Sequence, residues 1–254
     1  MTSLEGKTAL VTGSSRGIGR AIAQRLARDG ATVIIHYGKN REAAADALAE
    51  IESVGGHGFV VGAELSEPGA VESLFAAIDA ELEQRGIDHL DVVVNNAGIG
   101  LQKDLAGTSS EEFDQVFAVN VKAPFFIAQQ AATRMRAGGR IINISSMVAS
   151  RAYSGGSIVY GSSKAALEYL TLGLAAALGP RDITVNTIAP GATSSDFIRG
   201  MMENEQAANS LKAQTALRAI ATPEDVANVV ALIASPDSRF VTGERIRAGG
   251  GTLL

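Results

Sequence analysis

The chain has 254 residues, 46% of them hydrophobic, and is long enough to bury a large core as one α/β domain. Its net charge of −5 argues against nucleic-acid or anionic-membrane binding, because both need an electropositive face. Without cysteine there is no disulfide, thiol nucleophile or cysteine-ligated metal, and the three histidines lack metal-ligand spacing. No secretion signal or membrane-length apolar stretch is found. We expect a soluble, cytoplasmic protein that binds no metal.

Short β-branched runs alternate with amphipathic segments along the chain. Because such strands are buried on both faces and each is followed by a helix, they predict a doubly wound, Rossmann-type, mostly parallel sheet with helices on both faces. No repeat or linker interrupts residues 1–254, so we expect a single domain. The predicted strands are 8–12, 32–37, 57–62, 91–95, 140–145, 182–188 and 239–247, and the predicted helices are 17–29, 41–54, 71–84, 110–135, 162–178 and 223–234, the last capped by Thr222.

The turn after the first strand is rich in glycine, with the spacing Gly-x-x-x-Gly-x-Gly over Thr12–Gly19. Glycines permit a tight turn and a close approach to a pyrophosphate, and the following helix N-terminus offers free N–H groups. An ordinary glycine-rich turn would look similar. The position directly after the first strand favours cofactor binding.

The segment Asn95–Gly98 follows the fourth strand. In an open parallel sheet, ligands bind beyond the carboxyl ends of the strands, near the point where the strand order reverses. Small residues at that point leave room for a flat ring. A tight Asn-Gly type of turn is the alternative interpretation.

Tyr160 and Lys164 are four residues apart on a predicted helix and therefore share one face. A nearby ammonium lowers the pKa of a phenol, which makes the hydroxyl an acid/base near neutral pH. Such a pair alone usually marks a solvated helix face. Ser145 and Ser146 at the end of the fifth strand, and Asn120 in an earlier helix, make it informative.

Together these motifs resemble the short-chain dehydrogenase/reductase family over nearly the whole chain, in particular its carbonyl and 3-oxoacyl reductases. The residues appear in the family's order, and six motifs in order are highly specific. They are Thr12–Gly19, Asn95–Gly98, Asn120, Ser146, the pair Tyr160-x-x-x-Lys164 and Pro190-Gly191.

The resemblance implies a catalytic role for four of these residues. Tyr160 would exchange a proton with the carbonyl or alcohol oxygen, and Ser146 would hydrogen-bond that oxygen. Lys164 would hold the nicotinamide ribose and lower the pKa of Tyr160, and Asn120 would position a water. The loop between Ser146 and Tyr160 is about one residue longer than is usual in the family, which leaves Ser145 as the alternative serine.

The resemblance also implies a set of cofactor contacts, with Glu64 near the adenine, where the family mostly has Asp. The expected contacts are Gly13, Ser15, Arg16, Gly17, Ile18, Gly19, Tyr37, Lys39, Glu64, Leu65, Asn96, Ala97, Gly98, Tyr160, Lys164, Pro190, Gly191, Thr193 and Ser195.

The end of the second strand predicts NADP(H) rather than NAD. An NAD-specific site holds the ribose 2′-hydroxyl with an acidic side chain at the end of this strand. Here the strand ends His36-Tyr37-Gly38-Lys39, and no carboxylate follows it before Glu42. Arg16 and Lys39 can reach the same corner, and arginine suits a 2′-phosphate. The alternative is that both are ordinary surface cations.

The substrate pocket is expected to contain Ser146, Met147, Tyr153, Phe197 and Met201, beneath a lid at about residues 192–215. These mostly apolar residues predict reduction of an apolar or aromatic ketone, a small-molecule substrate. Packing of a helix onto the sheet would explain them equally well.

Two other functions stay open. A 3-oxoacyl reductase acting on carrier-bound groups typically has arginines where Ala137 and Ala176 stand, although Arg134, Arg136 and Arg181 lie nearby in sequence. A non-catalytic NADP-binding regulator would be expected to lack an intact Asn-Ser-Tyr-Lys set, and here the set is intact.

Leu170–Leu178 is apolar around nearly its full circumference, which predicts burial on two sides. One side would cover the sheet and the other a second subunit. The family commonly forms tetramers, so we expect a homotetramer, or otherwise a dimer.

Overall fold

A computed structural model describes residues 4–151, 158–195 and 203–252. Within these residues seven strands form one sheet, in the order β3-β2-β1-β4-β5-β6-β7, and every pairing is parallel. The Rossmann-type doubly wound fold is thereby confirmed. The strands are β1 (Thr8–Val11), β2 (Thr32–Tyr37), β3 (His57–Gly62), β4 (Leu90–Asn95), β5 (Met135–Ile144), β6 (Thr184–Pro190) and β7 (Arg245–Ala248).

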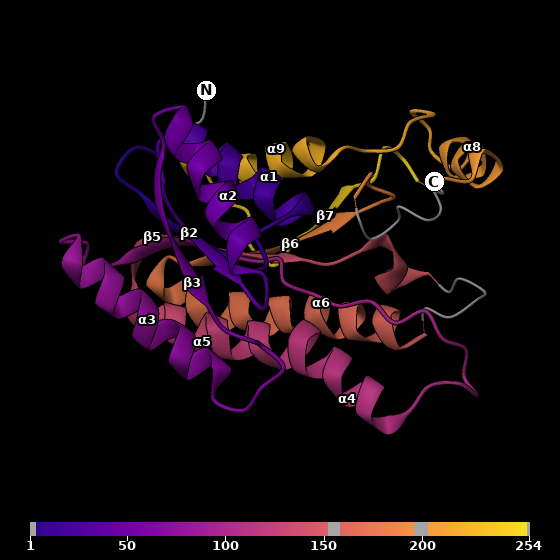
Figure 1. The fold of residues 1–254 in the computed structure, drawn as a ribbon, viewed down its shortest axis with the longest axis horizontal. Coiled ribbons are helices and arrows are strands. Elements are labelled where there is room, and N and C mark those ends of the chain that lie inside the picture. Colours follow the sequence, from indigo (N-terminus) through magenta and orange to yellow (C-terminus); the bar gives the residue numbers. More distant parts are fainter. Residues whose placement is uncertain (1–3, 152–157, 196–202, 253–254) are drawn as a thin grey trace.

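Helices cover both faces of the sheet (Figure 1). The helices α1 (Gly17–Arg28), α2 (Arg41–Ser53) and α9 (Pro223–Ala234) pack on one face. The helices α3 (Ala70–Gln84), α5 (Ala123–Arg134) and α6 (Ile158–Leu178) pack on the other. A short helix, α8 (Glu205–Ala213), lies apart from both layers, close to the C-terminal end of the chain (Figure 1).

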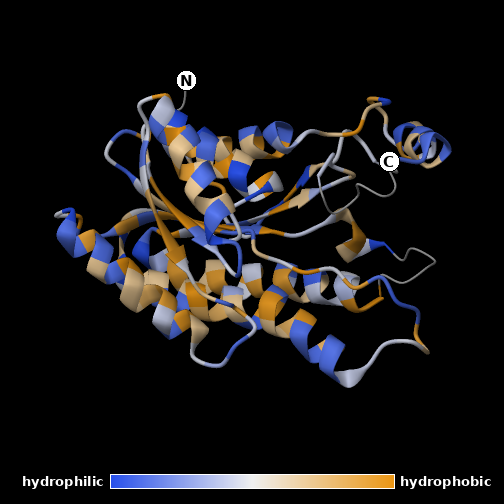
Figure 2. Cartoon of the chain, in the orientation of Figure 1, coloured by the Kyte–Doolittle hydropathy of each residue, from blue (hydrophilic) through white to orange (hydrophobic). Residues whose placement is uncertain are grey.

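Alternate residues of each central strand enter the two separate cores. Leu10 and Ile34 contribute to the core under α3, α5 and α6, whereas Val11 and Ile35 contribute to the core under α1, α2 and α9. Because successive side chains point to opposite faces, a strand covered on both sides is apolar throughout. Figure 2 shows the same arrangement, with hydrophobic residues toward the sheet and hydrophilic ones on the outer helix surfaces.

The strand order reverses at β1, which lies between β2 and β4. The chain first winds outward through β2 and β3, then returns to place β4 on the other side of β1. The connections that follow β1 and β4 therefore leave in opposite directions, and a crevice opens at their carboxyl ends. This edge of the sheet is where the predicted motifs meet.

The sequence predicts one helix over 110–135, and the structure interrupts it. The helix α4 (Ser110–Phe117) is followed by a π-helical turn at Ala118–Lys122 and then by α5. Pro124 has no N–H, so it cannot donate the usual α-helical hydrogen bond to the carbonyl of Asn120. A widened turn accommodates this defect without ending the helix.

The sequence predicts a final strand over 239–247, and this is wrong, because β7 begins only at Arg245. The Asn186 side chain holds the preceding segment as a loop. Its Nδ2 donates to the Val241 carbonyl at 2.7 Å, and its Oδ1 accepts from the Glu244 N–H at 3.1 Å. Those two backbone groups do not join the ladder with β6, although the Gly243 N–H between them still donates to the Val185 carbonyl at 2.8 Å.

Other boundaries move by a few residues. β5 begins at Met135, with a register shift against β4, and β6 begins at Thr184, after Asp182 in the left-handed region with φ of 57°. The helix α9 has the predicted bounds, and Thr222 caps it in a capping box with Asp225.

Candidate active site

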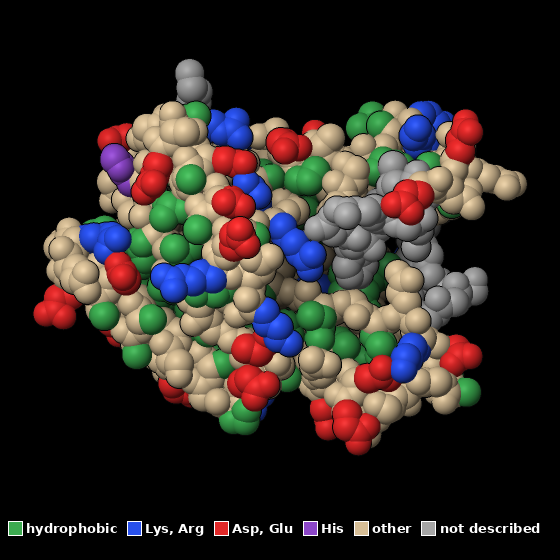
Figure 3. Space-filling view, viewed as in Figure 1, with side chains coloured by type: hydrophobic (Ala, Val, Ile, Leu, Met, Phe, Trp, Pro, Cys, Tyr) green, Lys and Arg blue, Asp and Glu red, His purple; other side chains and the backbone are tan. Residues whose placement is uncertain are grey.

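A cavity of about 1020 Å³ lies at the carboxyl edge of the sheet. Its walls come from the glycine-rich turn after β1, the ends of β4, β5 and β6, the start of α6, and residues at the end of α8. The space-filling view shows the surface hollowed between the two helix layers, with hydrophobic side chains exposed in the hollow (Figure 3). The cavity is large enough to take both a dinucleotide and a small substrate.

The glycine-rich turn packs against the end of β4 and has no space for a side chain at Gly13 or Gly19. A Cβ on Gly19 would lie 2.3 Å from the Gly13 carbonyl oxygen, and one on Gly13 would lie 2.9 Å from the Ala97 Cα. Gly13 and Gly17 also have positive φ values of 62° and 57°, which favour glycine. The turn therefore brings bare backbone and the first N–H groups of α1 to the cavity, as a pyrophosphate site requires.

Asn96 and Thr12 fasten this turn to β4. The Asn96 side chain donates to the carbonyls of Thr12 and Gly13, at 2.9 and 3.0 Å. The Thr12 hydroxyl accepts from the backbone N–H groups of Asn96 and Ala97, both at 3.0 Å. Asn95–Gly98 is thus a cross-link between two strand ends rather than a plain reversal of the chain.

His36, the residue before the end of β2, holds the same turn from the other side. The Gly13 N–H donates to His36 Nδ1 at 3.0 Å, so the neutral ring carries its proton on Nε2, which donates to the Ala63 carbonyl at 2.9 Å. Burial of the ring lowers the pKa of His36 to about 4. Its backbone N–H donates to Ser14 Oγ at 3.1 Å.

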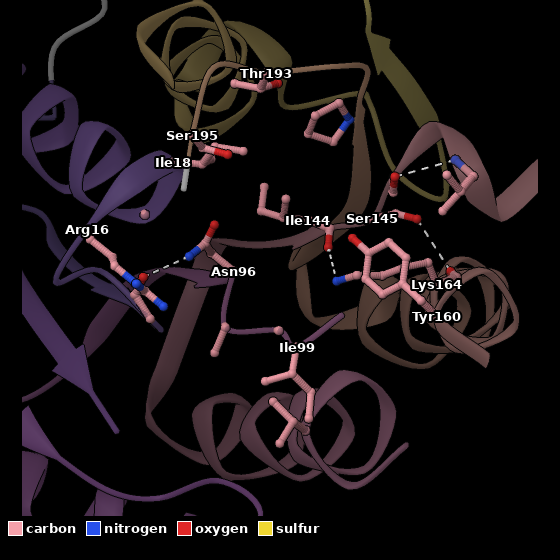
Figure 4. A pocket seen from close by; sticks show the side chains of 18 of the residues that line it. Arg16, Ile18, Asn96, Ile99, Ile144, Ser145, Tyr160, Lys164, Thr193 and Ser195 are labelled. Atoms are coloured by element: carbon pink, nitrogen blue, oxygen red, sulfur yellow. Dashed lines mark hydrogen bonds between the residues drawn. The ribbon is translucent and has the colours of Figure 1, made fainter. Parts of the chain in front are cut away.

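Lys164 and Tyr160 extend from α6 into the cavity, on the side opposite Asn96, Thr193 and Ser195 (Figure 4). The Lys164 ammonium donates to the Ile144 carbonyl at 2.8 Å, and burial lowers its pKa to about 8. The same nitrogen lies 5.8 Å from the centre of the Tyr160 ring.

The pKa of Tyr160 corrects the expectation from sequence. It is raised above its ordinary value because burial disfavours the phenolate, and a hydrogen bond from the Ser146 side chain only partly offsets this. The sequence predicts the opposite direction, through the charge of Lys164. That ammonium is directed to the Ile144 carbonyl, and its nitrogen lies 5.8 Å from the centre of the Tyr160 ring.

The structure separates the two candidate serines. Both line the cavity, but the hydrogen bond to Tyr160 is made by Ser146. The hydroxyl of Ser145 donates to Glu168 Oε1 at 2.8 Å and lies 3.4 Å from the Lys164 carbonyl oxygen. Ser146 is therefore the serine next to the phenol.

Asn120 is fully buried in the π-helical turn. Its Oδ1 accepts from the Ile99 N–H, and its Nδ2 donates to the Ile99 carbonyl, both at 2.9 Å. Nδ2 also donates to Ser163 Oγ at 3.0 Å, and Ser163 in turn donates to the Tyr160 carbonyl at 2.7 Å. The side chain thus holds the Ile99 loop against α6. Its expected role in positioning a water stays a prediction.

Most of the predicted cofactor residues line the cavity, and Tyr37 and Gly17 do not. The Tyr37 ring lies over Gly62, where a Cβ would be 2.6 Å from the ring, so a cofactor contact for Tyr37 is not what its position indicates. Gly17 supplies turn geometry. The predicted residues that line the cavity are Gly13, Ser15, Arg16, Ile18, Gly19, Lys39, Glu64, Leu65, Asn96, Ala97, Gly98, Tyr160, Lys164, Pro190, Gly191, Thr193 and Ser195.

Comparison with known proteins agrees with this geometry. Residues 13–252 match a family model described as enoyl-(acyl carrier protein) reductase. The chain belongs to the short-chain dehydrogenase/reductase family. It is 37% identical to hydroxynaphthalene reductase-like protein Arp2 of Metarhizium brunneum, over 99% of this chain and 96% of that protein.

Two solved short-chain dehydrogenase/reductase structures are similar along their whole length. The angucycline C-6 ketoreductase LanV with bound NADP is 45% identical, with a TM-score of 0.94, over 100% of this chain and 98% of that one. The reductase LugOII, which catalyses keto-reduction at C1 in lugdunomycin biosynthesis, is 44% identical, with a TM-score of 0.94, over 100% of both chains.

The substrate side of this reductase site is mostly apolar. Ser146 and Met147 line the cavity as predicted, and Ile99, Leu101, Val119, Val148 and Leu211 join them. Tyr153, Phe197 and Met201 lie outside the described residues. The predicted lid segment borders the cavity through Leu211, at the end of α8. Its movement stays a prediction.

Sequence reasoning missed His36 and Glu168 as residues of the site. His36 stands directly before Tyr37, which is one of the expected cofactor contacts, at the end of the second strand. Glu168 stands four residues after Lys164, so the helical spacing of Tyr160 and Lys164 continues to it. In both cases the position in the sequence, next to a predicted site residue or one helical turn after it, was the signal that could have found the residue.

The described ranges contain no helix with the length and apolar character needed to cross a lipid bilayer. Among the same residues, no three His, Asp or Glu side chains are grouped so as to hold a metal ion.

Replacing His36 with Asn should reduce the loss of stability in acid. The folded state keeps the ring neutral down to about pH 4, while the unfolded chain protonates near 6.5, so folding is destabilised as pH falls through this interval. The full effect is at most about 3 kcal/mol in the free energy of unfolding. Urea unfolding at several pH values across this interval gives the free energy of unfolding, and its slope against pH should be shallower for His36→Asn than for the unmodified protein. His57, which is exposed, supplies the control His57→Asn, and equal slopes for all three proteins would contradict this role.

Proposed function

We propose that this protein is an NADP(H)-dependent ketoreductase that reduces an apolar or aromatic ketone to a secondary alcohol. The observation that carries the proposal is the placement of the Tyr160 hydroxyl, hydrogen-bonded to Ser146 and next to Lys164, in the cavity that also contains the glycine-rich turn. Bound NADPH supplies the hydride. The chain itself supplies a proton donor, an oxygen-binding hydroxyl and a cradle for the cofactor.

Tyr160 and Ser146 act on the carbonyl oxygen. The Tyr160 hydroxyl donates its proton to the oxygen as negative charge develops there, and the Ser146 hydroxyl stabilises the same charge by a hydrogen bond. Lys164 lies beneath the phenol and holds the cofactor ribose. Asn120 keeps α6 and the Ile99 loop in register around them.

Burial keeps Tyr160 in the protonated form that can donate to a carbonyl oxygen. A phenol whose ionisation is disfavoured by burial is protonated at neutral pH, and the protonated form is the one that ketone reduction consumes. Alcohol oxidation would need the phenolate, which this environment disfavours.

The rim near β2 supports NADP(H) as the cofactor. Arg16 and Lys39 line the cavity there. Among the described residues that line it, Glu64 is the only carboxylate, and its Oε2 is 3.7 Å from Lys39 Nζ. Lys39 is 84% exposed, so this pair is weak and the ammonium can turn toward a 2′-phosphate. The relatives LanV and a Burkholderia cenocepacia short chain dehydrogenase have structures with NADP.

The cavity walls and the relatives support an aromatic ketone as the substrate. Ile99, Leu101, Met147 and Val148 provide a broad apolar surface beside Tyr160. The similar proteins are named for reduction of hydroxynaphthalenes and of an angucycline at C-6. Flat fused rings suit a wall of this kind.

Reduction of carrier-bound 3-oxoacyl groups is less well supported. The arginines that might replace the missing pair at Ala137 and Ala176 are engaged elsewhere: Arg134 pairs with Asp79, Arg136 with Asp88, and Arg181 donates to backbone carbonyls. They also surround the start of β5, at the edge of the sheet opposite the cavity. A non-catalytic regulator would not need the intact Tyr160 site.

We also propose a cytoplasmic homotetramer, with a dimer as the smaller assembly. Tyr169 and Leu172 on α6 are 76% and 52% exposed, and Phe113 on α4 and Phe125 on α5 are partly exposed as well. Apolar side chains on three adjacent helices are typical of a surface that a second subunit covers.

Replacing Tyr160 with Phe should abolish turnover and leave cofactor binding intact. Loss of the proton donor should lower kcat by about 100- to 10,000-fold, with little change in the Kd for NADPH. A panel of aryl ketones, followed by NADPH absorbance, measures turnover, and fluorescence titration measures binding. Exposed Tyr169 supplies the matched control Tyr169→Phe, which should keep full activity. Undiminished turnover in Tyr160→Phe would reject the assignment.

Removing both rim cations should weaken the use of NADPH selectively. In the double variant Arg16→Met, Lys39→Met, kcat/KM for NADPH should fall about 10- to 100-fold, because charge-assisted hydrogen bonds to the 2′-phosphate are lost. The kcat/KM for NADH, which lacks that phosphate, should change little. A wild-type enzyme that prefers NADH, or an equal loss with both cofactors, would overturn the NADP(H) assignment.

A further inference from the structure

An ion pair lies directly behind the candidate catalytic serine. Arg245, the first residue of β7, donates through Nε to Glu168 Oε1 on α6 at 2.7 Å. The two side chains are only 21% and 17% exposed. Glu168 follows Lys164 by four residues and Tyr160 by eight, so the three occupy successive turns on one face of α6.

Both members of the pair also bind the segment Ser145–Ser150, which we call the serine segment. Glu168 Oε1 accepts a hydrogen bond from the Ser145 hydroxyl at 2.8 Å. Arg245 Nη2 donates to the Ser150 hydroxyl at 3.2 Å and approaches the Ser146 carbonyl at 3.5 Å. The pair therefore fixes the segment at both ends and at its second residue.

The serine segment is otherwise held by bonds within its own turn and by burial of Met147, which is 4% exposed. Ser146 is the N-cap of a single 3-10 turn, Met147–Ser150, and its own side chain accepts only a long bond of 3.4 Å from Val148. Its backbone is anchored before this turn, where the Ser145 N–H donates to the Ile188 carbonyl at 2.8 Å. Glu168 and Arg245 add, from α6 and β7, the side-chain bonds that hold this turn from outside.

We propose that Glu168 and Arg245 are positioning residues for the reduction, which hold the Ser146 hydroxyl against Tyr160 without touching substrate. Neither side chain lines the cavity. The proposal rests on the ketoreductase function proposed above. It extends the active site by one turn of α6 and to β7, the strand farthest from the glycine-rich turn.

Charge and shape explain why this position needs an arginine and a carboxylate. The planar guanidinium presents several donors in a fixed fork, so one side chain can bind Glu168 and the serine segment together. A lysine has a single side-chain nitrogen, which could not reach Glu168 and the serine segment in the same way. Exposed ion pairs contribute little, but this pair is partly buried and bonded to three further groups, so its loss leaves unpaired polar atoms behind the site.

The test is a double-mutant cycle between Arg245→Gln and Ser146→Ala. If Arg245 acts through Ser146, Arg245→Gln should lower kcat about 10- to 100-fold in the wild-type background, because a misplaced charge-stabilising donor loses this much. In the Ser146→Ala background the same substitution should cost less than about twofold, since the positioned hydroxyl is already absent. The KM for NADPH should stay unchanged. The assay uses NADPH and the aryl ketone that the wild type reduces fastest.

Two controls separate positioning from damage to the fold. Arg134→Met removes a comparable ion pair with Asp79 at the opposite edge of the sheet and should leave kcat within about twofold. Thermal unfolding of each variant reports its stability. Should Arg245→Gln not fold, Glu168→Gln, which keeps the side-chain volume, takes its place in the cycle.

The outcomes are distinct. An equal loss from Arg245→Gln in both backgrounds, or no loss in the wild-type background, overturns the positioning role while leaving the reductase assignment intact. Full turnover in Tyr160→Phe rejects the reductase assignment itself, and the positioning role with it. A loss confined to the background that contains Ser146 supports the proposal.

Discussion

Lys164 places its ammonium 2.8 Å from the carbonyl oxygen of Ile144, the last residue of β5, in an environment buried enough to lower the lysine pKa to about 8. A cation removed from water must have a partner, so this bond fixes α6 to the end of β5. The loop after β4 packs closely against this nitrogen: a Cβ at Gly98 would lie 3.2 Å from Lys164 Nζ and from Asn120 Oδ1. The rest of the site is arranged around one buried nitrogen.

The two halves of the site are held by different means. On the cofactor side, Asn96 and His36 bind backbone groups of the glycine-rich turn, and the hydroxyl of Thr12, within the turn, binds the backbone that follows β4. On the substrate side, Ser146 begins a short turn that is bonded to Glu168 of α6 and Arg245 of β7. The first arrangement suits a cofactor whose pyrophosphate needs bare N–H groups. In the second, residues outside the cavity, Glu168 and Arg245, contact the segment that carries the oxygen-binding hydroxyl.

Much of the fold and most of the site were predictable because they follow local rules. Alternation of apolar strands and helices determined the sheet, and the order of the glycine-rich turn, Asn95–Gly98, Tyr160 and Lys164 indicated the family. The failures needed tertiary information. Asn186, on the neighbouring strand β6, holds part of the expected last strand as a loop, and Pro124 widens a helix that periodicity predicts as continuous. The pKa of Tyr160 was predicted from the nearest charge alone, whereas burial dominates it.

The central claim is that burial keeps the Tyr160 phenol protonated, ready to give its proton to a carbonyl oxygen. Spectrophotometric titration of tyrosinate in the wild type and in Tyr160→Phe, taken as a difference, isolates the ionisation of this one group. The account predicts a pKa above the ordinary tyrosine value of about 10. A difference curve with its midpoint at or below that value would show that the lysine charge outweighs burial, and would contradict the account.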